Sequence, residues 1–234
     1  MRIWIYVEGP SDRSALEALF GNWKKNLGER SSGIGLSIIS LTGKSRFLKA
    51  IGPRVAANLF HTADDIAVGL PDLHPTYPSG QHAHRNLASL QELQRKLVKD
   101  SLVQHFKIKR NDLDSTMERF QGSALKHDLE MLLLASKAQL RKILNTSDRL
   151  GNWTNPVENQ NNDRPPKLVV KELFRTKSQG RKNYRETIHA PQILRPVSSD
   201  IGSLLHDRNG VVQCPEFKRM LDWMGTKTGV PVYT

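Results

Sequence analysis

Two acidic residues follow apolar segments in the first third of the chain. Glu8 comes directly after residues 3–7 (IWIYV), and Asp72 comes just after residues 65–70 (DIAVGL). Carboxylate oxygens are the ligands that Mg²⁺ and Mn²⁺ prefer in proteins. An ion held by both residues would polarise a phosphodiester bond, so this pair predicts metal-dependent phosphodiester chemistry with Glu8 and Asp72 as catalytic metal ligands.

Three further side chains are candidates to assist this pair. Asp12 lies one turn into the segment after Glu8 and would add a direct or outer contact to the metal, and His74 is a candidate ligand two residues beyond Asp72. Glu130, or its neighbour Asp128, would supply a further acid. Ordinary structural roles stay open for all of them, since acids also stabilise helix N-termini and turns, and loop histidines are usually solvated.

The elements around these residues predict how they meet. Residues 3–7, 36–41 and 65–70 have the β-rich apolar composition of buried strands, and helical periodicity follows the first two of them, with Ser11 expected to cap the first helix. Alternating strands and helices favour an α/β fold with a parallel sheet. Since ligands bind outside the carboxyl ends of such strands, Glu8 and Asp72 would face one crevice if their strands are neighbours.

The rest of the chain is predicted to be mostly helical. We expect loops at residues 71–86 and 150–166, a short edge strand at 107–112, and helices at 45–60, 87–106, 124–144, from 167 onward, 190–205 and 214–224. The domain organisation that follows is an α/β core over residues 1–150, with a helical insertion at about 87–120. A loop-rich, helical region over residues 151–234 would pack on the same core.

The charge of the chain points to a polyanionic partner. The sequence has 35 Lys and Arg against 23 Asp and Glu, a formal net charge of +12. Such an excess favours nucleic acid, because cationic side chains displace counterions from phosphates. The candidate phosphate contacts are Lys44 and the basic run Arg175, Lys177, Arg181, Lys182 and Arg185. A solvated basic loop explains that run equally well.

Several classes of protein are excluded or disfavoured. Residues 42–45 (TGKS) resemble the end of an ATP-binding phosphate loop, but that motif needs a glycine at position 38, which is Ile38 here. ATP binding at this loop is therefore excluded. A single cysteine, Cys214, excludes an internal disulfide and a cysteine-based zinc site within one chain. No apolar run is long enough for a membrane span, and the first residues lack the pattern of a signal peptide, so we expect a cytoplasmic protein.

Residues 7–12 (VEGPSD), followed by a leucine-bearing helix, resemble the opening motif of Toprim domains. The match is closer to a family of uncharacterised Toprim-related proteins, similar to the overcoming-lysogenization-defect nucleases, that are encoded beside AAA or ABC-type ATPases. Later segments resemble the same family in the same order: 127–134 (HDLEMLLL), 155–158 (NPVE), 163–166 (DRPP) and 214–217 (CPEF). The resemblance therefore spans most of the chain.

This resemblance implies a Toprim-like core whose Glu8 and Asp72 hold Mg²⁺ or Mn²⁺ for cleavage of nucleic acid, with DNA favoured. It also implies an ATPase partner and a role in anti-phage defence. One position departs from the family pattern, because its Asp-x-Asp pair is Asp72-Leu73-His74 here. The alternative is therefore a degenerate Toprim subunit that binds nucleic acid or regulates an ATPase. A primase-like or RNA-processing enzyme is a third candidate, and the oligomeric state stays open.

Overall fold

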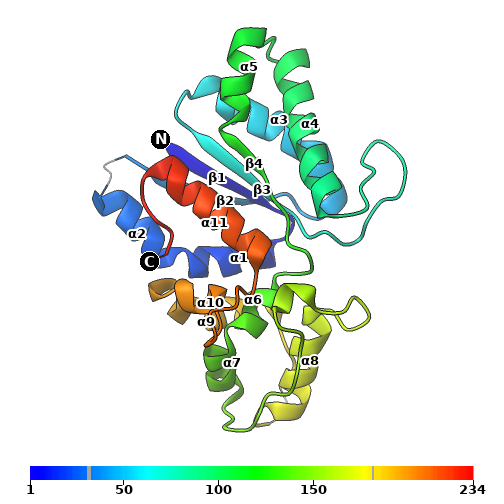
Figure 1. The fold of residues 1–234 in the computed structure, drawn as a ribbon, viewed down its shortest axis with the longest axis vertical. Coiled ribbons are helices and arrows are strands. Elements are labelled where there is room, and N and C mark those ends of the chain that lie inside the picture. Colours follow the sequence, from blue (N-terminus) through cyan, green and yellow to red (C-terminus); the bar gives the residue numbers. More distant parts are fainter. Residues whose placement is uncertain (31–32, 181, 234) are drawn as a thin grey trace.

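The computed structural model describes residues 1–30, 33–180 and 182–233, and its centre is a four-stranded parallel sheet (Figure 1). The strand order is β2-β1-β3-β4, with β1 at Arg2–Val7, β2 at Gly35–Ser40, β3 at Ile66–Leu70 and β4 at Phe120–Gly122. The first three strands confirm those predicted from the sequence. The chain moves from β1 to β2 on one side and then to β3 on the other, so the connections diverge around β1.

Helices cover both faces of this sheet, because alternate residues of each strand point to opposite sides. In β1, the side chains of Ile3, Ile5 and Val7 join a core with α1 (Pro10–Leu19), α2 (Gly21–Arg30) and α11 (Pro215–Thr228). Tyr6 joins a second core with α3 (Lys44–His61) and α4 (Leu87–Gln104). The predicted α/β class is confirmed, and the arrangement is consistent with a Toprim-like core.

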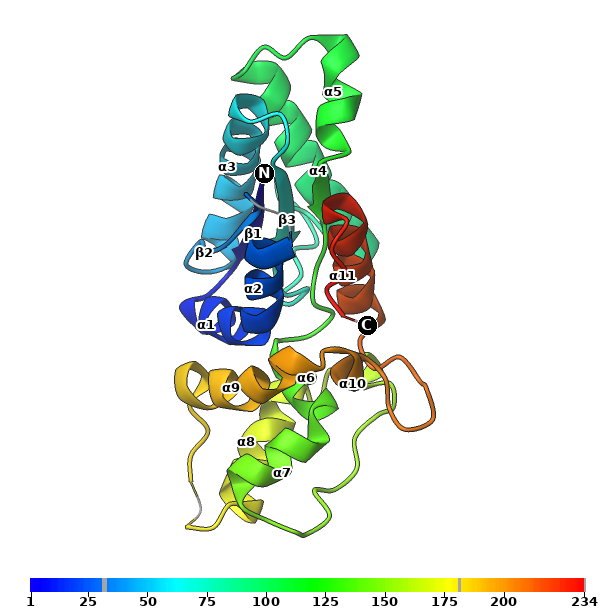
Figure 2. The same ribbon diagram turned by 90° about the vertical axis from the view of Figure 1, so that its left-hand side faces the viewer.

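A helical lobe lies beyond the carboxyl ends of the strands (Figures 1 and 2). It comprises α6 (Glu130–Ala135), α7 (Lys137–Leu144), α8 (Pro166–Lys177), α9 (Glu186–Leu194) and α10 (Gly202–Leu205), with 3₁₀ turns at Val157–Asn159 and Arg195–Ser199. In this lobe α9 packs against α1, and α11 then returns to the sheet. The helices α6 and α7, which the sequence assigns to the first unit, pack on α8 and α9.

The edge strand predicted at residues 107–112 is wrong. The chain forms α5 from Arg110 to Met117, and β4 forms the edge of the sheet next to β3. Phe120 is buried and pairs with Ala67 of β3, which gives β4 the apolar anchor that the basic segment 107–112 lacks. Between β3 and β4 the chain forms α4 and α5, which fall within residues 87–120, where a helical insertion is expected.

Two predicted long helices are interrupted. The helix expected at 124–144 begins at Glu130 and breaks at Ser136, whose hydroxyl donates to the carbonyl of Leu132. The helix expected at 190–205 begins earlier, at Glu186, and passes into a 3₁₀ turn containing Pro196, which has no N–H to continue the α-helix. By contrast, α3 runs on through Pro53. Among the described residues, no helix is long and apolar enough to span a membrane.

Candidate metal centre

The neighbouring strands β1 and β3 bring Glu8 and Asp72 together. Val7 pairs with Leu70 in parallel register, so both carboxylates follow the same edge of the sheet. Glu8 Oε1 accepts a hydrogen bond of 3.2 Å from the backbone N–H of Asp72. The expectation that these two acids share one crevice therefore agrees with their positions in the structure.

Asp12 reaches the same crevice from the first turn of α1. Its Oδ2 accepts a hydrogen bond of 2.8 Å from the N–H of Gly9, which is the residue that precedes the helix. The N-cap is thus Gly9, and the predicted cap at Ser11 is wrong, because Pro10 already occupies the first helical position. This local bond turns the Asp12 carboxylate back toward the end of β1.

A third group of acids arrives from the segment that continues β4. That segment runs parallel to the β3 end, with a bridge between Asp72 and Leu125, and then reaches Asp128 and Glu130. Asp128 Oδ2 accepts the backbone N–H of Lys167 at 3.2 Å. Glu130 is the first residue of α6 and is buried.

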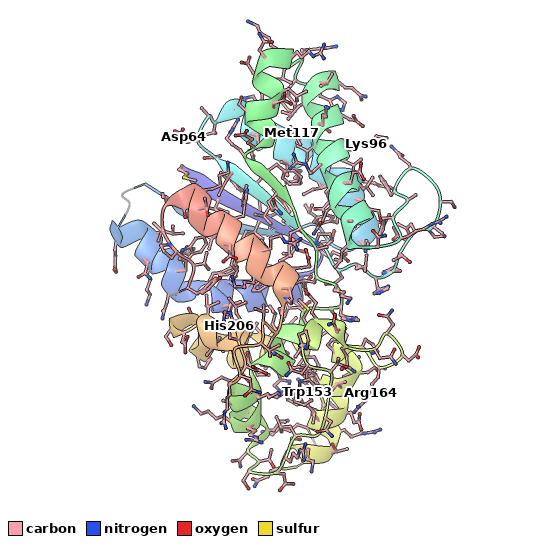
Figure 3. All side chains as sticks on the ribbon, viewed as in Figure 1. Asp64, Lys96, Met117, Trp153, Arg164 and His206 are labelled. Carbon is pink, nitrogen blue, oxygen red and sulfur yellow. The ribbon has the colours of Figure 1, made fainter. Side chains whose placement is uncertain are left out.

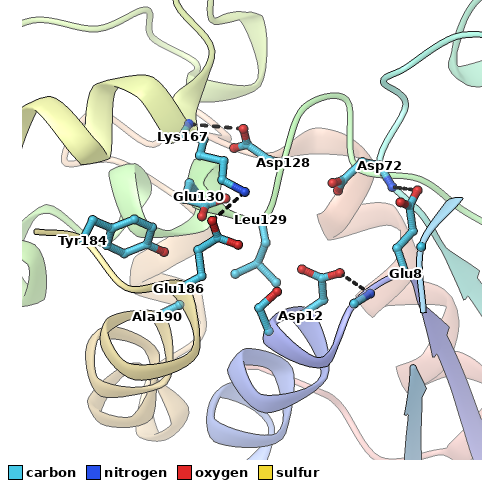
Figure 4. A pocket seen from close by; sticks show the side chains of 13 residues that line it. Glu8, Asp12, Asp72, Asp128, Leu129, Glu130, Lys167, Tyr184, Glu186 and Ala190 are labelled. Carbon is cyan, nitrogen blue, oxygen red and sulfur yellow. Dashed lines mark hydrogen bonds and ion pairs between the residues drawn. The ribbon is translucent and has the colours of Figure 1, made fainter. Parts of the chain in front are cut away.

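The helical lobe closes the opposite side of the crevice (Figure 4). Lys167 of α8 pairs with Glu186 of α9, with 2.7 Å between Nζ and Oε1, and Tyr184 points its hydroxyl toward these acids. The cavity between them is partly open to solvent and has a volume of about 190 Å³. Its polar walls are formed by Glu8, Asp12, Asp72, Asp128, Glu130, Lys167, Tyr184 and Glu186.

Burial raises the pKa of five acids in this cavity, namely Glu8, Asp12, Asp72, Asp128 and Glu130. The pKa of Glu8 rises to about 7 and that of Glu130 to about 8, with burial the main cause and a neighbouring aspartate, Asp12 or Asp128 respectively, adding to it. Burial also raises the pKa of Asp72 well above its usual value, and the charges of Asp12 and Glu8 reinforce the shift. The cavity therefore gathers more carboxyl groups than it can hold fully ionised, and some of them retain a proton near neutral pH.

Asp128 and Lys167 show how the cavity partly compensates this charge. Burial raises the pKa of Asp128 to about 6, while hydrogen bonding from the Lys167 backbone and the Lys167 charge oppose the rise. For Lys167 burial lowers the pKa, but the bond to Glu186 and the charge of Glu130 outweigh it and raise the pKa overall. One ammonium group thus faces several acids.

Lys44 does not have the surface position that a direct phosphate contact requires. Its side chain is only 6% exposed, and its ammonium donates to the backbone carbonyls of Asp72 and Leu73, the latter at 2.6 Å. Burial lowers its pKa to about 8, against the opposing charge of Glu8. The predicted phosphate contact is corrected to an internal role, because Lys44 begins α3 directly behind the Asp72 loop and anchors that loop.

His74 is not brought into the cavity wall. Its exposed ring lies beside His127, with 6.3 Å between the ring centroids. The chain turns away from the cavity after Asp72, where the N–H of Leu73 bonds to the carbonyl of Leu125. The position of His74 therefore gives no support to its predicted role as a metal ligand.

The predicted basic run lies at the end of α8 and in the following loop. Arg175, Lys182 and Arg185 are exposed, whereas Lys177 pairs with Asp148 at 3.3 Å. Arg181 lies outside the described residues. This basic surface belongs to the same lobe that supplies Lys167 and Glu186 to the acidic cavity, but none of its described cations lines that cavity.

The acids in the cavity fit a hard divalent cation. All the donors are oxygens, and Asp128 Oδ1 is buried without a hydrogen-bond partner among the described residues. Within that part of the chain, no three His, Cys, Asp or Glu residues are already gathered closely enough to hold a metal. An ion would draw the flanking carboxylates inward, and it would neutralise the mutual repulsion that adds to burial in raising their pKa values.

Sequence reasoning did not single out Lys167, Tyr184 or Glu186. Lys167 comes from α8 and Glu186 from α9, with Tyr184 in the segment between them, and α9 packs against α1 of the sheet core. The available signals were weak: Lys167 follows a Pro-Pro pair, and Glu186 follows the basic run. Neither pattern indicates a site by itself.

Comparison with known proteins adds no assignment to this geometry, since no family model, no curated protein and no solved structure matches the chain.

Proposed function

We propose that this protein is a metal-dependent nuclease with a Toprim-like core that hydrolyses phosphodiester bonds of nucleic acid. The observation that carries the proposal is the convergence of Glu8, Asp12, Asp72, Asp128 and Glu130 on one cavity at the carboxyl edge of a parallel sheet. Ligand sites in open α/β folds lie at this edge, where strand connections diverge. Raised pKa values of several acids in one cavity further support a functional site.

The acidic residues of the cavity divide into those that would bind the metal ion and one that would transfer a proton. Glu8, Asp12 and Asp72, with the free oxygen of Asp128, would hold Mg²⁺ or Mn²⁺. The ion, when bound, supplies Lewis-acid polarisation of the phosphodiester. Glu130 is the most buried acid, and its pKa of about 8 suits a group that gains or loses a proton near neutral pH.

The basic surface supports nucleic acid as the substrate. A net charge of +12 persists although the cavity itself is acidic, so the cations are concentrated elsewhere on the surface. Exposed Arg175, Lys182 and Arg185 lie on the lobe that forms one wall of the cavity. Such cations position a phosphate backbone while the carboxylates act on one bond. An ATPase partner and a role in anti-phage defence are proposed on the Toprim resemblance alone.

A second candidate is a Toprim-like subunit that binds nucleic acid or an ATPase without cleaving. The observation that favours it is His74, which replaces the expected second aspartate and lies outside the cavity wall. Retention of Glu8 and Asp72 in contact with each other favours the nuclease.

A cleavage assay separates the two candidates. Purified protein is incubated with plasmid DNA, single-stranded DNA or RNA in the presence of Mg²⁺ or Mn²⁺. Each reaction is run with and without an ATPase encoded by a neighbouring gene. We expect cleavage that falls about 100-fold or more in Glu8→Gln and in Asp72→Asn, the order of loss seen when a charge-stabilising group is removed. The matched control is Glu92→Gln, an exposed acid on α4.

The outcomes are distinct. Cleavage that persists at the wild-type level in both cavity variants would refute the assignment of the site. Absence of cleavage with any substrate or metal, together with retained binding of nucleic acid or of the ATPase, would favour the non-catalytic subunit.

A further inference from the structure

A groove on α8 adjoins the carboxylate cavity. Its volume is about 540 Å³, and its walls are formed by Arg164, Leu168, Lys171, Glu172, Arg175, Asn183 and Tyr184. The acidic residue among them, Glu172, is paired with Arg164 at 2.7 Å. Tyr184 also lines the cavity, so the two hollows share one wall. Arg164 lies in the helical lobe beside α8 (Figure 3). A polymer bound in the groove would therefore extend toward the acidic residues of the cavity.

The cations of α8 are arranged along one helix face. Lys167, Lys171 and Arg175 are four residues apart, which places them on one side of the helix at a rise of about 6 Å per step. Lys167 is paired with Glu186, but Lys171 and Arg175 have no ion-pair partner among the described residues. These two exposed cations are free to bind successive phosphates of one strand.

The same groove presents apolar surface beside these charges. Leu168 of α8 is 51% exposed, and half-buried Tyr184 contributes an aromatic wall. Proteins that bind single strands combine a basic track for the backbone with aromatic or apolar surfaces for the bases. Stacked, paired bases of a duplex do not offer their faces to such a wall.

We propose that the α8 groove binds single-stranded nucleic acid and directs its backbone past Tyr184 into the carboxylate cavity. Cleavage of the bound strand rests on the proposed function. Binding of the strand in the groove does not require that the protein cleaves it. Single-stranded DNA and RNA share a phosphate backbone and unpaired bases, and the experiment compares binding of the two.

The test measures binding by fluorescence anisotropy in the presence of EDTA, so that cleavage cannot contribute. The probes are labelled oligodeoxythymidylate, labelled oligouridylate and a DNA duplex of equal length. We expect Lys171→Ala/Arg175→Ala to weaken single-strand binding about tenfold and to reduce the salt slope by about 1.4, since each phosphate contact to a single strand contributes about 0.7. The matched control is Lys96→Ala/Lys99→Ala, which removes two exposed cations from α4.

A second pair of variants tests the apolar wall. Leu168→Ser should weaken single-strand binding several-fold without changing the salt slope, because it removes contact with bases but no charge. Ile188→Ser changes an apolar residue of similar exposure on α9 and should leave binding unchanged. Circular dichroism of each variant checks that the helical lobe remains folded.

Wild-type affinity and salt slope in Lys171→Ala/Arg175→Ala would overturn the inference, and so would an equal loss of duplex binding. The two proposals can fail separately. Binding that depends on the groove, without any cleavage, would refute the nuclease function and support the groove as a binding site. Cleavage that is unaffected by the groove variants would support the nuclease function and refute the role of the groove.

Discussion

At the scale of single residues, burial controls the charge of the cavity acids. Glu130 is 4% exposed and lies beside Asp128, so its anion loses hydration and meets a second negative charge. Its pKa is about 8, against an ordinary value of 4.5. Between these two values the folded protein binds more protons than the unfolded chain. The free energy of unfolding therefore falls as pH rises through this window.

Replacing Glu130 tests this linkage. In metal-free buffer, we expect Glu130→Gln to raise the melting temperature by about 4 °C at pH 8.5, for a relief of roughly 1–2 kcal/mol. At pH 5 the carboxyl is protonated in the folded state, so the change should be small. Thermal melts at the two pH values measure the difference, with the exposed Glu92→Gln as control. An equal effect at both pH values would show that charge is not the cause.

At the scale of elements, the close approach of α3 and α4 holds the Asp72 loop in place. Gly52 of α3 faces α4, where a Cβ atom would lie 2.5 Å from the carbonyl oxygen of Leu97 and 2.8 Å from Ser101 Oγ. The first residue of α3 is Lys44, which anchors the loop after β3. Packing between two helices thus extends to the loop that carries Asp72, a proposed metal ligand.

A pair of glycine substitutions tests this contact. Gly52→Ala forces α3 and α4 apart, so we expect it to lower the free energy of unfolding by about 2 kcal/mol. The control is Gly28→Ala on α2, where a Cβ meets no atom within 4 Å and where alanine should stabilise by up to about 1 kcal/mol through helix propensity. Urea denaturation measures both. Stabilisation of similar size in both variants would contradict the tight contact.

At the scale of the whole molecule, the cavity is shared between the sheet core and the helical lobe. Glu8 and Asp72 come from strand ends, whereas Glu130 and Glu186 come from the lobe (Figure 4). Their mutual repulsion acts between these two parts of the protein. A divalent ion bound among the acids would convert that repulsion into a link that exists only in the folded chain.

Thermal melting in metal solutions tests this link. At an Mn²⁺ concentration about 100-fold above its dissociation constant, binding adds about 2.7 kcal/mol, so we expect the melting temperature to rise by about 5–10 °C. Mg²⁺ should act in the same direction. Asp72→Asn should remove most of the shift, while Glu92→Gln should keep it. No shift with either ion, or an undiminished shift in Asp72→Asn, would argue against the metal centre.

The sequence by itself determined the features that are encoded over short distances. The strands β1, β2 and β3 were predictable because apolar β-rich runs mark buried strands. The meeting of Glu8 and Asp72 was predictable because carboxyl ends of adjacent parallel strands share one edge of the sheet. Their metal-binding role stays a prediction.

Only the tertiary structure decided which distant segments complete the cavity. Glu186 reaches it because α9 packs on α1, and Lys167 because α8 packs on α6. No local spacing in the sequence encodes either contact. Lys44 is internal because α3 places it behind the Asp72 loop, whereas His74 leaves the wall because the chain turns toward Leu125. Residue type and periodicity specify which face of a helix or strand is buried. The charge state of a side chain, and the residues that it contacts, depend on what is packed around it. Burial among neighbouring acids is therefore the property of this site that only the folded chain creates.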